Sequence, residues 1–90
     1  MGMLERIAVK NETKARIKPL VFGDPVTNVC AGEGNPYRQG YFVRTGKDCV
    51  ECTDKKGGFW WVGTEVIFAG HLEYEECEKL FKPIWEANYR

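Results

Sequence analysis

The chain has 90 residues, which is enough for one domain with one hydrophobic core. Thirteen basic residues balance thirteen acidic ones, whereas a nucleic-acid-binding domain usually has a basic excess. The sequence has no run of 18 apolar residues that could span a membrane and no apolar leader at its start, so we expect a cytoplasmic protein with reduced cysteines.

The first 22 residues are predicted to form a basic arm or a hairpin. Ile7 and Val9, then Ala15 and Ile17, alternate with polar residues on either side of Asn11-Glu12-Thr13, which is typical of two paired strands. The same segment carries positive charge that could contact phosphate, although a patch of this size is more often a solvated edge. Its basic residues are Arg6, Lys10, Lys14, Arg16 and Lys18.

Short extended segments separated by turn sequences fill residues 23–70 and predict a small five-stranded barrel. Residues 54–58 have the composition of a hairpin turn between two of these strands. Residues 31–40, rich in Gly, Asn and Pro, form the longest irregular stretch, and loops of this length are often functional. The expected strands are residues 26–30, 41–44, 49–53, 59–62 and 66–68.

From His71 onward the apolar residues recur at helical spacing, and acidic residues crowd the first turn, where the helix dipole favours them. Because Pro83 cannot continue the hydrogen-bond ladder, we expect a C-terminal helix over residues 72–82, with a kink or fresh start that extends to 88. The predicted class is therefore mainly β with one helix. The predicted organisation is a single domain over residues 1–90, with an arm over 1–22, a barrel over 23–70 and a helical end over 71–90.

Large aromatic rings are more numerous than a core of this size needs, with five Phe, four Tyr and three Trp. Successive side chains of a strand point to opposite faces, so Trp60 and Trp61 cannot both face the interior. The outward rings must be covered by the C-terminal helix, by a second copy of the chain or by a ligand. The expected binding residues on this face and its neighbouring loop are Tyr37, Arg38, Tyr41, Arg44, Trp60 and Trp61.

Cys49 and Cys52 have the spacing of half a zinc site, and Cys30, His71 and Cys77 could supply the remaining ligands of a four-ligand set. Residues three apart in a strand point to opposite faces, however, and a free cysteine also packs as a small hydrophobe. We therefore expect neither a metal nor a cofactor, and Cys49 and Cys52 are the metal candidates that the sequence offers.

No pattern in the sequence fixes a reaction. Gly32 and Gly34 could cradle a phosphate with help from Arg38 and Arg44, but turn chemistry explains the glycines equally well. The single histidine, His71, has no spacing that pairs it with a nucleophile. We predict no self-contained catalytic site.

Three stretches carry a resemblance to a known group: Gly40-Tyr41-Phe42-Val43, Cys49-Val50-Glu51 and Gly57-Gly58-Phe59-Trp60. With a strand, a long loop, three strands joined by tight turns and a short closing strand, residues 23–70 resemble small barrels of the Src-homology-three type. Within that group they are similar to the plasmid-type dihydrofolate reductases, which are carried on mobile gene cassettes and work as oligomers. Those enzymes' Val-Gln-Ile-Tyr motif has no counterpart between Val62 and Phe68, so the resemblance, which covers about half the chain, implies a fold and not the activity.

Three functions are compatible with these patterns. The leading hypothesis is a non-enzymatic binding module that contacts a protein or its own copy, as a homodimer or a higher oligomer, through the aromatic face. The first alternative is a nucleic-acid accessory protein that uses the basic arm with stacking rings. The second is a small-molecule-binding or enzymatic oligomer of the mobile-cassette type.

Overall fold

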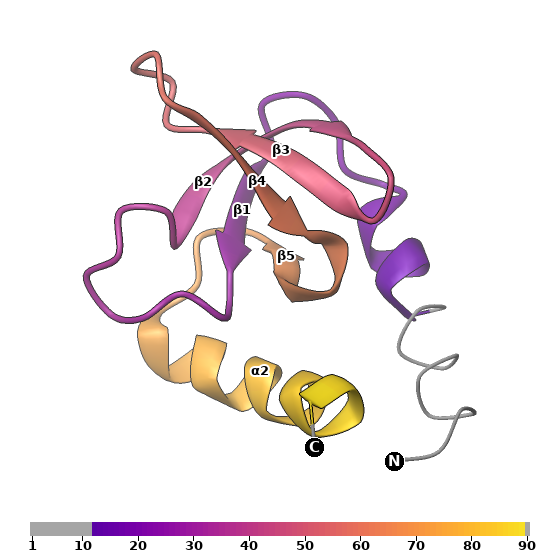
Figure 1. The fold of residues 1–90 in the computed structure, drawn as a ribbon. Helices are drawn as coiled ribbons and strands as arrows, with labels where there is room; N and C mark the ends of the chain where they lie inside the picture. Colours follow the sequence, from indigo (N-terminus) through magenta and orange to yellow (C-terminus); the bar gives the residue numbers. More distant parts are fainter. Residues whose placement is uncertain (1–11, 90) are drawn as a thin grey trace.

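A computed structural model describes residues 12–89 of the chain as one five-stranded sheet with helical segments beside it (Figure 1). The prediction of a mainly β chain with a C-terminal helix is confirmed. No helix in this described part is both long and apolar enough to cross a bilayer. The elements are β1 (Pro25–Asn28), β2 (Gln39–Thr45), β3 (Cys49–Thr53), β4 (Phe59–Gly63), the short 3-10 helix η1 (Thr64–Val66), β5 (Ile67–Ala69) and α2 (Tyr74–Tyr89).

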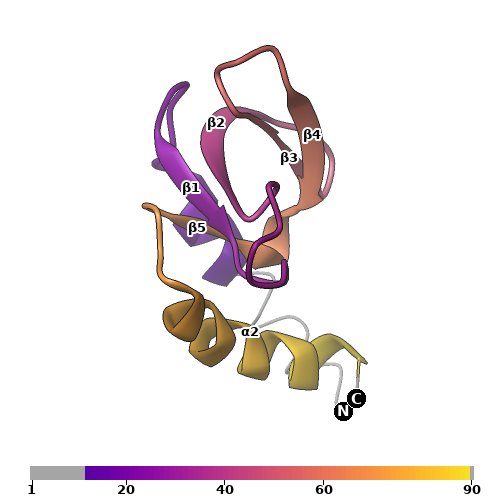
Figure 2. The same ribbon diagram turned by 90° about the vertical axis from the view of Figure 1, so that its left-hand side faces the viewer.

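All strand pairs are antiparallel, and the strand order across the sheet is β4-β3-β2-β1-β5. The sheet curls strongly (Figure 2), with a register shift between Phe42 and Arg44 of β2. Closure into a barrel is not confirmed, because β4 and β5 are the two ends of the strand order and do not pair with each other in the described residues.

The tight turns follow from local chemistry at positions that need a left-handed backbone. In the β3–β4 turn, Lys55 has φ 65° and Gly57 has φ 98°. The Asp54 carboxylate accepts hydrogen bonds from the backbone N–H groups of Lys56 at 2.7 Å and Gly58 at 2.9 Å. These bonds lower the pKa of Asp54, because they stabilise its charged form.

Two apolar clusters hold the fold together. The first lies inside the curled sheet, and Leu20, Trp60 and Val62 pack against its buried members. The second lies between α2 and the end of the sheet near η1, and Phe68, Leu72, Leu80 and Phe81 pack against its buried members. The buried residues are Ile17, Val26, Phe42, Val50, Cys52 and Ile67 in the first cluster, and Val29, Val66, Cys77 and Ile84 in the second.

The C-terminal helix α2 runs from Tyr74 to Tyr89 and continues through Pro83, where a kink or a fresh start was expected. A proline inside a helix costs about 3 kcal/mol because it removes one ladder hydrogen bond and crowds the preceding turn. Beyond Pro83, Ile84 and Ala87 are each only 7% exposed. Burial of these side chains offsets the cost of the proline, so one helix spans the segments before and after Pro83.

The arm also differs from the prediction, since residues 12–17 are helical where the alternation of Ala15 and Ile17 predicted a strand. The helical period places Thr13 and Ile17, one turn apart, in buried positions, whereas Ala15 is exposed. Ile7 and Val9, the other half of the predicted hairpin, lie outside the described residues.

Candidate functional site

Strand register divides the predicted aromatic face between two sides of the sheet. Cys52 pairs with both Phe42 and Trp60, and these three side chains belong to the first cluster and its surroundings. Trp61 pairs with Glu51, and Phe59 pairs with Thr53, so the rings of Phe59 and Trp61 point to the outer face. One tryptophan therefore faces the interior and its neighbour faces away.

The outer face of β4 is open. Phe59 is 61% exposed and Trp61 is 48% exposed. The helix α2, expected to be the main cover for such rings, instead packs at the other end of the sheet against the second cluster (Figures 1 and 2). The rings of Phe59 and Trp61 are thus left at the surface beside each other in the strand.

Basic side chains border the outward rings. The Arg44 guanidinium lies 5.2 Å from the ring centroid of Trp61, and its Nε donates a hydrogen bond to Glu51 Oε1 at 2.9 Å. The Lys55 ammonium lies 4.0 Å from the ring centroid of Tyr41. Cation–π contacts of this kind contribute roughly 0.5–1 kcal/mol at exposed sites, so they orient the rings more than they stabilise the fold.

Gly46 allows the Trp61 ring to lie against the β2–β3 turn. A Cβ atom at Gly46 would come within 2.9 Å of Trp61 Cζ3, which is closer than a side chain tolerates. The turn backbone therefore forms one border of the outer aromatic surface, which we define as Tyr41, Arg44, Phe59 and Trp61.

Tyr37 and Arg38 lie away from that surface, at the rim of the curled sheet. The Tyr37 ring packs on Trp60 with centroids 5.0 Å apart, and Gly40 lies beneath Trp60, where a Cβ atom would come within 2.7 Å of the ring. Arg38 Nη1 donates a hydrogen bond to the Leu72 carbonyl oxygen at 2.7 Å. Arg38 thus ties the long loop to the start of α2, and its guanidinium is engaged within the chain.

His71 is also part of this tie. Its ring lies edge-on to Tyr41 at 5.1 Å between centroids, and Nε2 is 2.8 Å from the Gly40 carbonyl oxygen. A nearby Thr27 hydroxyl donates to the Gly70 carbonyl oxygen and accepts from the Leu72 N–H. His71 therefore connects the sheet to the segment that leads into α2.

The CxxC pair is split by the strand. Cys49 pairs with Gly63 and Cys52 with Trp60, so the two sulfur atoms belong to opposite faces of β3. Burial raises the pKa of the Cys52 thiol to about 11, and the neighbouring Glu51 carboxylate adds to the rise, so Cys52 is a protonated core residue at neutral pH. Residues 12–89 contain no group of three or more His, Cys, Asp or Glu side chains placed to hold a metal ion.

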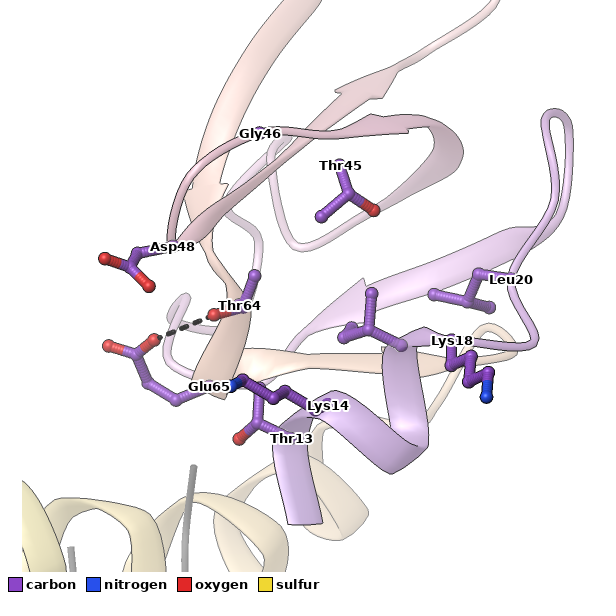
Figure 3. A pocket seen from close by; sticks show the side chains of 10 residues that line it. Thr13, Lys14, Lys18, Leu20, Thr45, Gly46, Asp48, Thr64 and Glu65 are labelled. Carbon is purple, nitrogen blue, oxygen red and sulfur yellow. Dashed lines mark hydrogen bonds between the residues drawn. The ribbon is translucent and has the colours of Figure 1, made fainter. Parts of the chain in front are cut away.

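A cavity of about 560 Å³ lies between the helical residues 12–17, the β2–β3 turn and η1 (Figure 3). Sequence reasoning missed it, because the arm was predicted as a strand or a loose segment. The pair Lys14 and Lys18 gave no signal, because residues four apart share a face in a strand as well as in a helix. The cavity is lined by Thr13, Lys14, Ile17, Lys18, Leu20, Thr45, Gly46, Asp48, Thr64 and Glu65.

Comparisons with protein-family models, with curated proteins and with solved structures found no match to this chain. The geometry of the outer aromatic surface and of the cavity therefore carries the functional argument by itself.

Proposed function

We propose that the protein is a non-enzymatic binding module that associates with a second copy of itself through β4. The observation that carries the proposal is that β4 is an edge strand with two large exposed rings, Phe59 and Trp61, on its outer face. An exposed, apolar edge strand is a template for pairing with another chain, and natural proteins otherwise blunt such edges with charge, proline or a covering element.

The hydrogen-bond pattern shows which backbone groups of β4 are free. The Thr64 N–H donates to the Asp48 carbonyl oxygen at 3.2 Å, and the Asp54 N–H donates to the Gly58 carbonyl oxygen at 3.2 Å. In an antiparallel ladder, residue pairs that are hydrogen-bonded through their backbones alternate with pairs that are not. Between Gly58 and Thr64, the backbone of every second residue therefore hydrogen-bonds to β3. The backbone groups that point away from β3 are those of Phe59, Trp61 and Gly63.

These free groups favour one register for two antiparallel copies of β4. A two-fold axis at Trp61 sets the two Trp61 residues opposite each other and sets Phe59 of each copy opposite Gly63 of the other. In that register the large ring of Phe59 lies over a residue that has no side chain to collide with it. Directly opposed aromatic residues contribute about 0.2–1 kcal/mol per pair beyond the backbone bonds.

The proposal includes the fold type. A strand, a long loop, three strands joined by tight turns and a short closing strand after η1 follow one another in the order that suggested a small barrel of the Src-homology-three type. In such a molecule β4 and β5 would approach each other without pairing along their length. An experimental structure with β4 and β5 on separate, unrelated sheets would contradict this part of the proposal.

The test is the molar mass in solution, measured by light scattering and sedimentation between about 1 and 300 µM, a range that spans weak to moderate association. We expect a dimer that dissociates on dilution, and Trp61→Ser with Phe59→Ser should remain monomeric throughout. The matched control is Phe22→Ser, which removes an even more exposed ring (75%) from the turn before β1. A monomer at every concentration for the unmodified chain, or equal loss in the control, contradicts self-association.

Variants of the same surface distinguish self-association from binding of nucleic acid. If the surface binds single-stranded nucleic acid instead, its affinity will fall steeply with salt and with loss of Arg44 and Lys55, while the chain stays monomeric. In the arm, Arg16 gives its guanidinium hydrogen bonds to the carbonyl oxygens of Glu65 and Ile67, which favours the protein partner over phosphate contact by that residue.

A further inference from the structure

The cavity beside residues 12–17 has hydrogen-bonded segments on both sides. On the helical side, Arg16 donates from Nε to the Ile67 carbonyl oxygen at 2.9 Å and from Nη2 to the Glu65 carbonyl oxygen at 3.0 Å. Its guanidinium also lies 3.9 Å from the centroid of the Phe68 ring. These contacts hold the helical segment against η1 and β5.

The opposite wall is held by backbone bonds. The Gly46 N–H donates to the Cys49 carbonyl oxygen at 2.8 Å, and the Thr64 N–H donates to the Asp48 carbonyl oxygen at 3.2 Å. Thr45 lies between this wall and the helical segment (Figure 3). The cavity volume of about 560 Å³ lies within the range of small-molecule sites.

Charged side chains of both signs line the cavity. Lys14 and Lys18 come from the helical side and Asp48 and Glu65 from the other, and the Lys14 side chain extends toward Glu65 and away from Lys18 (Figure 3). Within residues 12–89 the ion pair formed at 4 Å or less is Arg44–Glu51, and the Glu65 carboxylate also interacts electrostatically with the Arg16 guanidinium. Glu65 Oε2 accepts a hydrogen bond of 3.4 Å from the Thr64 hydroxyl.

The floor between the charged sides is apolar. Ile17 is a buried member of the first cluster, and Leu20 packs against that cluster. An apolar body lying on Ile17 and Leu20 would be removed from water at about 25 cal/mol per Å² of apolar surface. The floor therefore favours a ligand that is charged only at its ends.

We propose that this cavity binds a small zwitterion with an apolar body, of the dipeptide or amino-acid class. The ligand carboxylate lies toward Lys18 on the helical side, and the ligand ammonium lies toward Asp48 on the turn side. A ligand with one charge leaves the other of these two side chains facing an uncharged group, so it binds more weakly. This inference does not rest on self-association through β4, since none of Tyr41, Arg44, Phe59 and Trp61 lines the cavity, although Gly46 borders both regions.

The test is a titration of the ¹⁵N-labelled chain with L-leucyl-L-leucine, followed by amide chemical shifts. We expect saturable shifts at Thr45, Gly46 and Thr64. The amide of the same dipeptide, which lacks the carboxylate, and the N-acetyl dipeptide, which lacks the ammonium, should each bind about three- to tenfold more weakly. The absence of saturable shifts at 10 mM dipeptide, or equal affinity for all three compounds, overturns the proposal.

Variants locate the site. Asp48→Asn removes the charge while keeping a residue that tolerates the left-handed backbone at this position, where φ is 61°, and should weaken dipeptide binding roughly threefold or more. Lys47→Gln is the matched control, because Lys47 is exposed in the same turn but does not line the cavity. Thr45→Phe fills the cavity and should abolish the shifts at Gly46 and Thr64. Binding unchanged in both Asp48→Asn and Thr45→Phe overturns the assignment to this cavity.

Discussion

The apolar side chains at the two ends of the sheet differ in how they are covered. At the β5 end, α2 covers Val29 and Val66 with its own Cys77 and Ile84, and all four are buried. At the β4 end the outer face has no covering helix, and Phe59 and Trp61 stay at the surface. Both ends are built from large apolar residues, so hydrophobicity alone does not tell a core from a binding surface. Whether an element of the same chain lies over them makes the difference.

The largest effect is expected where α2 covers the sheet. Ile84→Ala leaves a cavity between α2 and the sheet, beyond Pro83, and should lower the free energy of unfolding by about 2–4 kcal/mol. Urea denaturation followed by fluorescence measures the change. Lys82→Ala, at an exposed position of the same helix, is the control and should change stability by less than about 0.5 kcal/mol. Equal effects of the two substitutions would contradict the covered-end description.

A slightly smaller loss is expected for Arg16→Met, which keeps an apolar stem but removes the donors to the Ile67 and Glu65 carbonyl oxygens. Hydrogen bonds from charged donors contribute about 1.5–3 kcal/mol, and the loss should be near the lower end because burial lowers the pKa of Arg16 and so opposes its charged form. Thermal unfolding measures the change. An unchanged midpoint would show that the helical segment is not held to β5 by this residue.

The β3–β4 turn should respond to pH. Because hydrogen bonds lower the pKa of Asp54 below its ordinary value of 3.8, the folded state is favoured above that pH, and this contribution is lost as pH falls through the lowered pKa. Asp54→Ala should therefore be less stable than the unmodified chain at pH 7, and the gap should narrow toward pH 2. Paired denaturation curves at several pH values measure it, and a gap that does not depend on pH would contradict the role of the carboxylate.

The smallest effect on stability is expected at the open end. Phe59→Ser, measured by denaturation at a concentration where the chain is monomeric, should change the free energy of unfolding by no more than about 0.5 kcal/mol. The same substitution should strongly reduce association. A loss of several kcal/mol in the monomer would show that Phe59 belongs to the core, and the comparison between the two ends would fail.

Part of the fold was predictable because it depends on short-range patterns. The strand at Cys49–Thr53 has the predicted bounds, the strand at Phe59–Gly63 differs by one residue, and alternation along it correctly required Trp60 and Trp61 to face opposite sides. The helical period after His71 located α2 but not its continuity through Pro83, because burial of Ile84 and Ala87 outweighs the cost of the proline.

The candidate sites were less predictable. Arg38 and Tyr41 are close in sequence but make different contacts. Arg38 hydrogen-bonds to the Leu72 carbonyl oxygen, whereas the strand register places Tyr41 on the outer aromatic surface. The cavity depends on residues 12–17 being helical and on their meeting the turn at 45–48 and η1, which are distant in sequence. No local sequence pattern predicts contacts between segments that are so far apart in the chain.

The sequence by itself determined the strands, their turns, the amphipathic helix and the excess of aromatic rings, because these depend on side-chain period and on local backbone preferences. The tertiary structure decided which rings are covered, because α2 can lie against only one end of the sheet and packs where Cys77 and Ile84 meet Val29 and Val66. It also decided that Arg16 holds a helix in place and that Lys14 and Lys18 line one cavity with Asp48 and Glu65, because each of these arrangements joins segments that are remote along the chain.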